Sequence, residues 1–206
     1  VFQMDAASGI QGIAMTHPEN VEDLATLNSV IRLMGDGKGE TPLEKYKRFR
    51  EDPTAWENEM IECGLNEDER KLLHSYLDQS SGICEAQERI MSMLLDPQIA
   101  GWSLGLVDAV RKTIAKKKPK EFAALREKFF QNAEEKHLSK ALTQYAWRCA
   151  ETQAGYSFNL AHTLAYSLIG LQEMNLAYHY PTIYWNCANM IVDSGAMDGM
   201  IENDAD

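Results

Sequence analysis

The class of fold is decided by residues 119–133, which read PKEFAALREKFFQNA. Phe122, Leu125, Phe129 and Ala133 follow one another at steps of three and four residues, so in a helix they share one face. Pro119 suits the first position of that helix, because the N–H that proline lacks would have no partner there. The stretch therefore predicts an amphipathic helix that begins at Pro119.

Helix signals continue on both sides of this stretch. Residues typical of helix starts stand at Asn20, Thr41, Asp52, Asn66, Ser103, Ser139 and Pro181. Gly64 is expected in the left-handed conformation just after a helix. Ser80–Gly82 should form a turn before a helix from Ile83 to Leu95, which Asp96-Pro97 ends or bends. No alternation of period two persists beyond a few residues, so the sequence predicts an all-α, irregular multi-helix domain of roughly eight to ten helices.

The C-terminal part of the chain changes in character. His162 to Leu176 is apolar nearly all round, which favours a central buried helix. From Ser194 the sequence holds two glycines and four acids, and this tail is expected to be disordered. We therefore expect one folded domain over residues 1–193 and an acidic tail over residues 194–206.

Composition argues against several classes of protein. The 206 residues contain no run of about 18 apolar residues, so no membrane-spanning helix is expected. The N-terminus has no basic segment leading into an apolar run, so it is not expected to be a signal peptide. It also lacks an initiator methionine, which favours a fragment of a longer protein. The cysteines form no C-x-x-C pair and are expected to be reduced and packed in a cytoplasmic interior: Cys63, Cys84, Cys149 and Cys187.

Ten residues from Arg111 to Lys120 form a basic block. They hold six lysines and arginines and no acid, a charge of +6 in a chain whose net charge is −11. If the helix here runs to Ala115, Lys116–Lys118 crowd its C-terminus, where the dipole favours cations. Ordinary capping lysines are therefore one interpretation. Six like charges repel one another unless an anion is present, so the block also predicts a phosphate partner whose binding weakens with salt.

The second candidate segment is residues 154–162, AGYSFNLAH. It places Tyr156, Phe158, Asn159 and His162 where a loop enters the apolar helix. Such a loop can set a ring against a base or sugar and a histidine N–H against a phosphate. Aromatic residues at such a junction are also common core anchors, so both interpretations stay open.

The usual catalytic motifs do not occur in the sequence. It has no P-loop, no Rossmann glycine pattern and no G-x-S-x-G. Glu85 and Glu88 would be neighbours on a helix, where they could hold a metal, form a solvated face, or pair with Arg89. We predict no catalytic residue and no metal ligand in this chain.

Five segments, in their order and spacing, resemble the fingers region of the alpha subunit of bacterial DNA polymerase III, a C-family replicative polymerase. They are Val1–Gly9, Val21–Asn28, Gly82–Met91, Ala100–Pro119 and Ala154–Tyr166. The most specific elements are K-K-K-P, at the end of the fourth segment, and A-G-Y-x-F-N-x-x-H, in the fifth. The resemblance covers the chain to about Val192.

The chain departs from the family pattern at several positions. The R-P-G-P turn of the family is reduced to Arg32, Ala86 replaces a tyrosine, and Leu160 replaces a lysine. Lys112 replaces an arginine, which keeps the charge but loses the planar fork that grips phosphate. Residues 36–80 match poorly. A divergent, virus-encoded polymerase fits this pattern.

The resemblance implies the fingers portion of a DNA-directed DNA polymerase, which binds incoming dNTP and template–primer DNA and is inactive without the palm. Mg²⁺ would be held by palm aspartates that lie outside this chain. The other implied partners are the palm and thumb of the same polymerase and further replisome proteins, in the cytoplasm of a bacterial cell. No membrane partner is expected.

The resemblance also assigns roles to residues. The basic block would neutralise the charge of the triphosphate or of the template backbone. Gln87 and Glu88 would line the nucleotide. Tyr156, Asn159 and His162, in the segment 154–162, would lie near the base or sugar and the phosphates. The residues expected to bind nucleotide or DNA are Arg32, Gln87, Glu88, Arg111, Lys112, Lys116, Lys117, Lys118, Tyr156, Asn159 and His162.

Two other hypotheses stay open. One is a non-catalytic helical module that binds nucleic acid or a replication partner. The other is an interaction domain whose basic block meets an acidic protein surface. Titration with DNA at two salt concentrations separates them, because phosphate contacts weaken steeply with salt.

Overall fold

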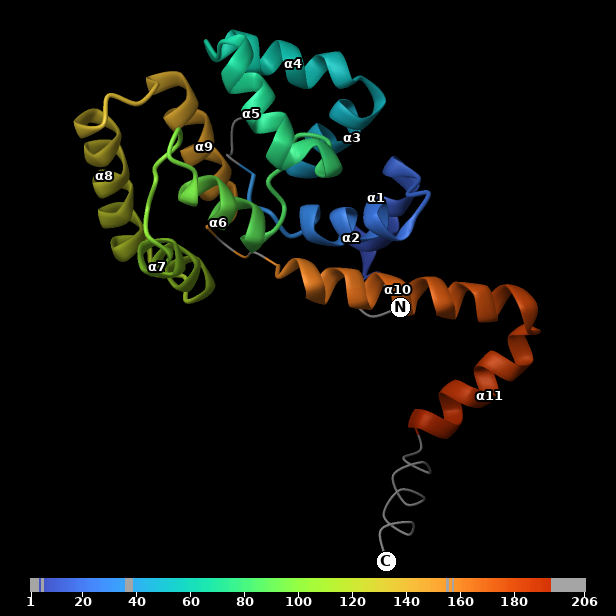
Figure 1. Ribbon diagram of the computed structural model, residues 1–206. Coiled ribbons are helices and arrows are strands. Elements are labelled where there is room, and N and C mark those ends of the chain that lie inside the picture. Colours follow the sequence, from blue (N-terminus) through green and yellow to red (C-terminus); the bar gives the residue numbers. More distant parts are fainter. Residues whose placement is uncertain (1–3, 5, 36–38, 155, 157, 194–206) are drawn as a thin grey trace, which may run out of the picture. The chain divides into compact units, whose positions relative to one another are not determined.

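Helices make up the regular structure of the chain, as the computed structural model shows for residues 4, 6–35, 39–154, 156 and 158–193 (Figure 1). The α-helices are α1 (Ala7–Thr16), α2 (Val21–Val30), α3 (Pro42–Glu51), α4 (Pro53–Glu62), α5 (Glu67–Leu77), α6 (Gln87–Leu95), α7 (Leu104–Ala115), α8 (Pro119–Glu135), α9 (Lys140–Thr152), α10 (Leu160–His179) and α11 (Thr182–Asp193). A short 3₁₀ helix, η1 (Asp78–Ser80), follows α5. Over these residues the all-α prediction is confirmed.

Several predicted helix boundaries are confirmed by the backbone contacts that form them. Thr41 and Asn66 each start a helix with a reciprocal capping box, in which Glu44 and Glu69 return the hydrogen bond. Gly64 has φ +83° just after α4, the left-handed conformation expected of it. These starts were predictable because each depends on residues no more than a few positions apart.

The first helix, α1, was not predicted. With it, the described residues contain eleven α-helices, where the sequence predicted roughly eight to ten helices. Its sequence, ASGIQGIAMT, has no broad apolar stripe, and its N-cap makes no side-chain hydrogen bond. Small residues form its packed face instead. A Cβ on Gly12 would lie 2.8 Å from Cδ1 of Leu27, so the glycine allows α1 to approach α2 closely.

The helix predicted from Ile83 begins only at Gln87. Residues 83–86 are buried, and Ala86 is extended and forms an isolated parallel bridge with Phe158. The Nε2 of Gln153 donates to the carbonyl oxygens of Cys84 and Ala86, at 2.9 and 3.1 Å. Residues far along the chain thus satisfy this backbone, which overrides the local helical pattern.

Residues 2–167 form one compact unit with a continuous hydrophobic core. Helix α8 packs beside α7 and α9, and Phe129 and Ala133 are buried, with Phe122 and Leu125 partly buried against the core. The ring centroids of Phe129 and Trp147, on α9, lie 5.0 Å apart. The amphipathic face predicted for residues 119–133 is therefore confirmed.

Residues from 168 onward belong to a second unit. The buried central helix predicted for residues 162–176 is wrong beyond Ser167, where many large apolar side chains are exposed: Leu168, Ile169, Met174, Leu176, Tyr178, Ile183, Tyr184, Met190 and Val192. Cys187 is exposed too, which corrects the expectation that all four cysteines are interior. An apolar helix is buried only where other segments cover it, and α11 itself has no buried residue.

The expectations for the acidic tail and for the domain boundary remain open. The acidic tail, residues 194–206, lies outside the described residues, and the single domain over residues 1–193 stays a prediction. Among the helices that are described, none is long and apolar enough to span a membrane.

Candidate nucleotide and nucleic-acid interface

The basic block forms the turn between α7 and α8. The N–H of Lys116 donates to the carbonyl of Lys112 at 3.0 Å and closes α7, as the sequence predicted. Lys117 is left-handed, with φ +50°, and the N–H of Lys118 donates to the carbonyl of Thr113 at 3.2 Å. These bonds fold Lys116–Lys118, here called the lysine turn, into a tight exposed loop between two helices.

Neighbouring acids reduce the charge that this region presents. Asp108 forms ion pairs with Arg111 and with Lys112, both at 2.7 Å. Hydrogen bonds from Lys112 and then from Arg111 lower the pKa of Asp108. Lys118 pairs with Glu121 at 2.5 Å. Asp108 precedes the basic block on α7 and Glu121 follows it on α8, so the count over residues 111–120 alone overstated the local charge.

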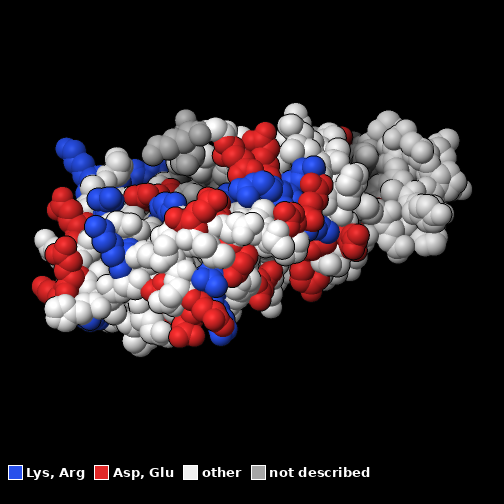
Figure 2. Space-filling view, turned by 90° about the horizontal axis from the view of Figure 1, so that it is seen from above, with Lys and Arg blue, Asp and Glu red and all other residues white. Residues whose placement is uncertain are grey.

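Within the described part of the chain, Lys116 and Lys117 form no ion pair, and both are exposed. On the face drawn in Figure 2, basic and acidic residues are interspersed rather than separated into large areas of one sign. Two unpaired cations on one exposed turn, flanked by exchangeable surface ion pairs, are therefore the strongest local attraction for a phosphate in this region.

Residues 154–162, here called the aromatic loop, lead into α10. Rings in and just after this loop contact one another in a chain. Tyr156 meets Phe158 edge-on with centroids 4.8 Å apart, Phe158 stacks on His162 at 5.6 Å, and His162 contacts Tyr166 at 4.5 Å. Phe158 is 3% exposed and Tyr156 is 46% exposed. Phe158 is thus a core anchor, whereas Tyr156 and His162 present ring surface to solvent. Gly155 and Ser157 of the motif lie outside the described residues.

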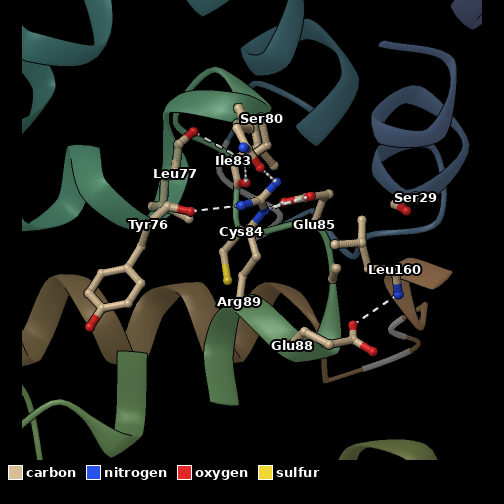
Figure 3. A network of polar contacts seen from close by, with 12 residues as sticks. Ser29, Tyr76, Leu77, Ser80, Ile83, Cys84, Glu85, Glu88, Arg89 and Leu160 are labelled. Atoms are coloured by element: carbon tan, nitrogen blue, oxygen red, sulfur yellow. Dashed lines mark hydrogen bonds and ion pairs between the residues drawn. The ribbon is translucent and has the colours of Figure 1, made fainter. Parts of the chain in front are cut away.

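Asn159 and Glu88 have structural partners that the sequence does not reveal. The Oδ1 of Asn159 accepts from the N–H of His162 at 3.1 Å and caps α10. The carboxylate of Glu88 accepts from the N–H of Leu160 at 2.9 Å (Figure 3). It also accepts from the side-chain amide of Asn159. A negative charge at this helix N-terminus is favourable. Glu88 therefore fastens α6 to the start of α10.

Gln87 also lies beside the loop, because its N–H donates to the carbonyl of Phe158 at 2.9 Å. Arg32 lies in the turn after α2, where its N–H donates to the carbonyl of Ser29 at 3.1 Å. No contact described here joins Arg32 to the lysine turn or to the aromatic loop. Helix α6 packs against both α7 and α9, so it links the helix of the basic block to the segment that holds the loop.

Glu85 and Glu88 do not form a metal site. The side chain of Glu85 is 1% exposed and accepts two hydrogen bonds from Nε of Arg89, at 2.7 and 2.8 Å. Figure 3 shows this pair on one side of the 83–86 segment, with Arg89 also reaching the carbonyl of Tyr76, at 2.9 Å. Of the alternatives left open, pairing with Arg89 holds for Glu85, which is buried rather than on a solvated face. No cluster of metal-binding side chains is found in the described residues.

Sequence reasoning missed Asp108, Gln153 and the buried position of Glu85. Asp108 could have been found, since it lies three and four residues before Arg111 and Lys112 on the same helix. Gln153 had no such signal, because its partners are almost 70 residues away in the sequence.

Known proteins resemble this chain over most of its length. The family described as "Bacterial DNA polymerase III alpha subunit finger domain" matches residues 1–137. "Probable DNA polymerase YorL" of Bacillus subtilis and the "DNA-directed DNA polymerase" of Bacillus phage SPbeta are each 38% identical over 199 residues, which is 96% of this chain and 15% of theirs. The "DNA polymerase III subunit alpha" of Pasteurella multocida is 30% identical over 181 residues, 88% of this chain and 15% of that protein.

The chain belongs to the bacterial DNA polymerase III alpha subunit finger domain family. It spans about 15% of the length of these curated relatives. The resemblance drawn from the basic block and the aromatic loop is therefore confirmed at the level of the family, while the roles of individual residues stay predictions.

Proposed function

We propose that this chain is the fingers portion of a DNA-directed DNA polymerase, which binds incoming dNTP and template–primer DNA in the cytoplasm of a bacterial cell. The observation that carries the proposal is the exposed lysine turn, closed by backbone hydrogen bonds between α7 and α8, in a chain of the finger domain family. A virus-encoded origin is part of the proposal; the match to a protein of phage SPbeta is equalled by the match to a protein of Bacillus subtilis, so the two matches do not separate a viral from a bacterial source.

Lys116 and Lys117 are the primary phosphate contacts in this proposal. They need not give up an ion pair to bind, whereas Lys118 must leave Glu121, and Arg111 and Lys112 must leave Asp108. Exposed pairs of this kind are worth at most about 1 kcal/mol, so phosphate can displace them. These three residues then add charge once an anion has bound.

The aromatic loop supplies the second contact. Tyr156 and His162 offer exposed ring surface for a base or sugar, and Phe158 anchors them to the core. Gln87, Glu88 and Asn159 hold the loop against α6. Their contribution to nucleotide binding is through placement of the loop, while Arg32 remains a candidate DNA contact that rests on the family resemblance.

The divalent metal chemistry of polymerization does not fit the residues described here. Glu85 is committed to Arg89, and Glu88 to Leu160 and Asn159. Mg²⁺ is therefore assigned to residues outside this chain, where two ions would activate the primer hydroxyl and stabilise the leaving pyrophosphate. The palm and thumb of the same polymerase and other replisome proteins are the remaining proposed partners.

Binding of a short primer–template duplex tests the proposal. We expect the double variant Lys116→Glu/Lys117→Glu to weaken binding at low salt at least about tenfold and to reduce the salt dependence of the binding constant by about two phosphate contacts. The control is Lys47→Glu/Lys71→Glu, which makes the same change of charge on α3 and α5 at exposed pairs with Glu51 and Glu67.

Equal losses in the two double variants would mean that net charge, not the lysine turn, governs binding. No DNA binding at low salt by the unchanged chain would favour the alternative of a non-catalytic module for a protein partner. Template-directed incorporation of dNTP by this chain alone would contradict the assignment of the metal site to another part of the polymerase.

A further inference from the structure

A cavity of about 420 Å³ lies within the unit of residues 2–167, away from the lysine turn. Its wall includes Leu33, Glu59, Cys84, Tyr145, Arg148 and Cys149. Two cysteines therefore face one space large enough for a small molecule. The proposed function uses neither of them.

The two thiols line the same cavity and interact with one another, which raises the pKa of Cys84 and lowers that of Cys149. Nε2 of Gln153, four residues after Cys149 in the chain, donates a hydrogen bond to the sulfur of Cys84 at 3.2 Å. Cys84 is 3% exposed, whereas Cys149 is half-buried. In Figure 3 the Cys84 side chain points away from that of Glu85, as expected for neighbours in an extended segment.

We propose that Cys84 and Cys149 are a redox modification site, at which a small hydroperoxide entering the cavity oxidises the pair to a disulfide. The bond would join the buried segment 83–86 to α9. Cytosolic disulfides are uncommon and are usually transient or redox-sensing, which is the kind of role this site would have.

The environment distinguishes the two sulfurs. Interaction with the Cys84 thiol lowers the pKa of the Cys149 thiol, and the positive charges of Lys45 and Arg148 act in the same direction. The same interaction, together with burial, raises the pKa of Cys84 well above its usual value. Cys149 is also the less buried of the two, so it is the sulfur that reacts first.

The reaction balances in two steps. The Cys149 thiolate attacks one peroxide oxygen, the O–O bond breaks, and the departing hydroxide takes up a proton as water, which leaves a sulfenic acid on Cys149. The sulfur of Cys84 then attacks the sulfur of Cys149 and displaces hydroxide, which leaves as water with the proton from Cys84. Two thiols and one hydrogen peroxide thus give one disulfide and two waters.

The consequence concerns the aromatic loop. Residues 83–86 carry the bridge from Ala86 to Phe158, and Gln153 already ties this segment to the end of α9. A disulfide would make that tie covalent. We expect it to reduce the mobility of the segment against which the aromatic loop is held.

The test uses the full 206-residue chain with Cys63→Ser and Cys187→Ser, which leaves Cys84 and Cys149 as its two thiols. Hydrogen peroxide should remove both free thiols and two hydrogen atoms from the intact mass. Peptide mapping without reductant should recover the Cys84–Cys149 link, and a reductant should restore the thiols. Because contact raises the effective concentration, the link should form at least about tenfold faster in the folded chain than in urea.

The matched control is Cys84→Ser/Cys149→Ser, which keeps the other two cysteines and should form no link within one chain. The first variant retains the pair and so decides the matter even if this control fails to fold. Oxygen addition at Cys149 without a link, a link formed only in urea, or no reaction in the folded chain would each overturn the proposal.

Discussion

Arg89 compensates the charge of Glu85, whose side chain is 1% exposed. Its guanidinium binds both carboxylate oxygens and also reaches the carbonyl of Tyr76. A buried carboxylate without its partner costs several kcal/mol, whereas an exposed pair contributes about 1 kcal/mol or less. Single ion pairs in this molecule should therefore differ greatly in their effect on stability.

We expect Arg89→Ala to lower the free energy of unfolding by about 3–5 kcal/mol, because it leaves the Glu85 carboxylate buried and uncompensated. Arg126→Ala is the control, since its pair with Glu151 is about half exposed on both sides, and it should cost no more than about 1 kcal/mol. Urea titration followed by circular dichroism measures both. Similar losses in the two variants would contradict the assigned burial of Glu85.

His74 makes stability depend on pH. Burial lowers the pKa of its imidazole, but hydrogen bonds to Asp78 and Glu57, at 2.5 and 3.2 Å, outweigh burial and raise the pKa above its usual value. A group whose pKa is raised by folding stabilises the fold fully below its unfolded pKa, about 6.5 for histidine. That contribution is lost as the pH rises through the raised folded value.

The difference in unfolding free energy between the unchanged chain and His74→Gln should therefore be largest at acidic pH and shrink above about pH 6.5. Thermal or urea unfolding from pH 5.5 to 8.5 measures it. His137→Asn is the control, because His137 is an exposed residue with φ +53°, a conformation that asparagine also tolerates. A constant difference across this range would show that His74 acts by packing alone.

Residue roles were predictable only where their causes are local. The pairing of Glu85 with Arg89 follows from a spacing of four residues, and it was among the alternatives that the sequence offered. The burial of Glu85 was not, because it depends on contacts made by the whole 83–86 segment. Glu88 illustrates the same limit, since Leu160 lies 72 positions away in the sequence.

At the scale of helices, Glu88 connects α6 to the first turn of α10. Its carboxylate accepts from the N–H of Leu160, while Asn159 caps the same helix end through His162. Both contacts satisfy N–H groups that have no partner within the helix. The start of α10 is thus set by a side chain of another helix as much as by its own cap.

Glu88→Ala should increase amide hydrogen exchange at residues 160–163 and leave exchange in α8 unchanged, because the helix end loses a charged acceptor worth about 0.5–2 kcal/mol. Glu88→Gln keeps an acceptor and should show a smaller increase. Exchange measured by mass spectrometry on the 206-residue chain provides the readout, with Glu127→Gln on the exposed face of α8 as the control. Unchanged protection at residues 160–163 in Glu88→Ala would remove Glu88 from this role.

The helices, too, were predictable where nearby residues determine them and unpredictable where distant contacts do. The starts of α3, α5 and α8 were predicted from caps and from Pro119, all within one helical turn. Helix α1 and the extended segment 83–86 were not, since α1 packs through Gly12 against Leu27 and the segment is held by Gln153 and Phe158. Apolar patterns of period 3.6 give no sign of packing through small residues or of backbone hydrogen bonds to distant residues.

At the scale of the whole molecule, the exposed apolar residues of α10 and α11 need an explanation separate from the proposed phosphate contacts. Tyr178 is 89% exposed, and Ile183, Met190 and Val192 are each more than 60% exposed. Single exposed apolar residues are ordinary, whereas many together indicate a surface that associates with something. The relatives are several times longer than this chain, and in such proteins other segments are available to cover these residues.

Without such cover, the 206-residue chain should self-associate as its concentration rises, because burying these side chains in a second copy removes them from water. Sedimentation velocity over a concentration series measures the association, and we expect Met190→Glu/Val192→Glu to weaken it at least about tenfold by adding charge to the apolar surface. The same substitutions should leave the unfolding midpoint of residues 2–167 unchanged, since α11 has no buried residue. A monomer at every concentration would mean that the apolar residues of α10 and α11 do not form an associating surface.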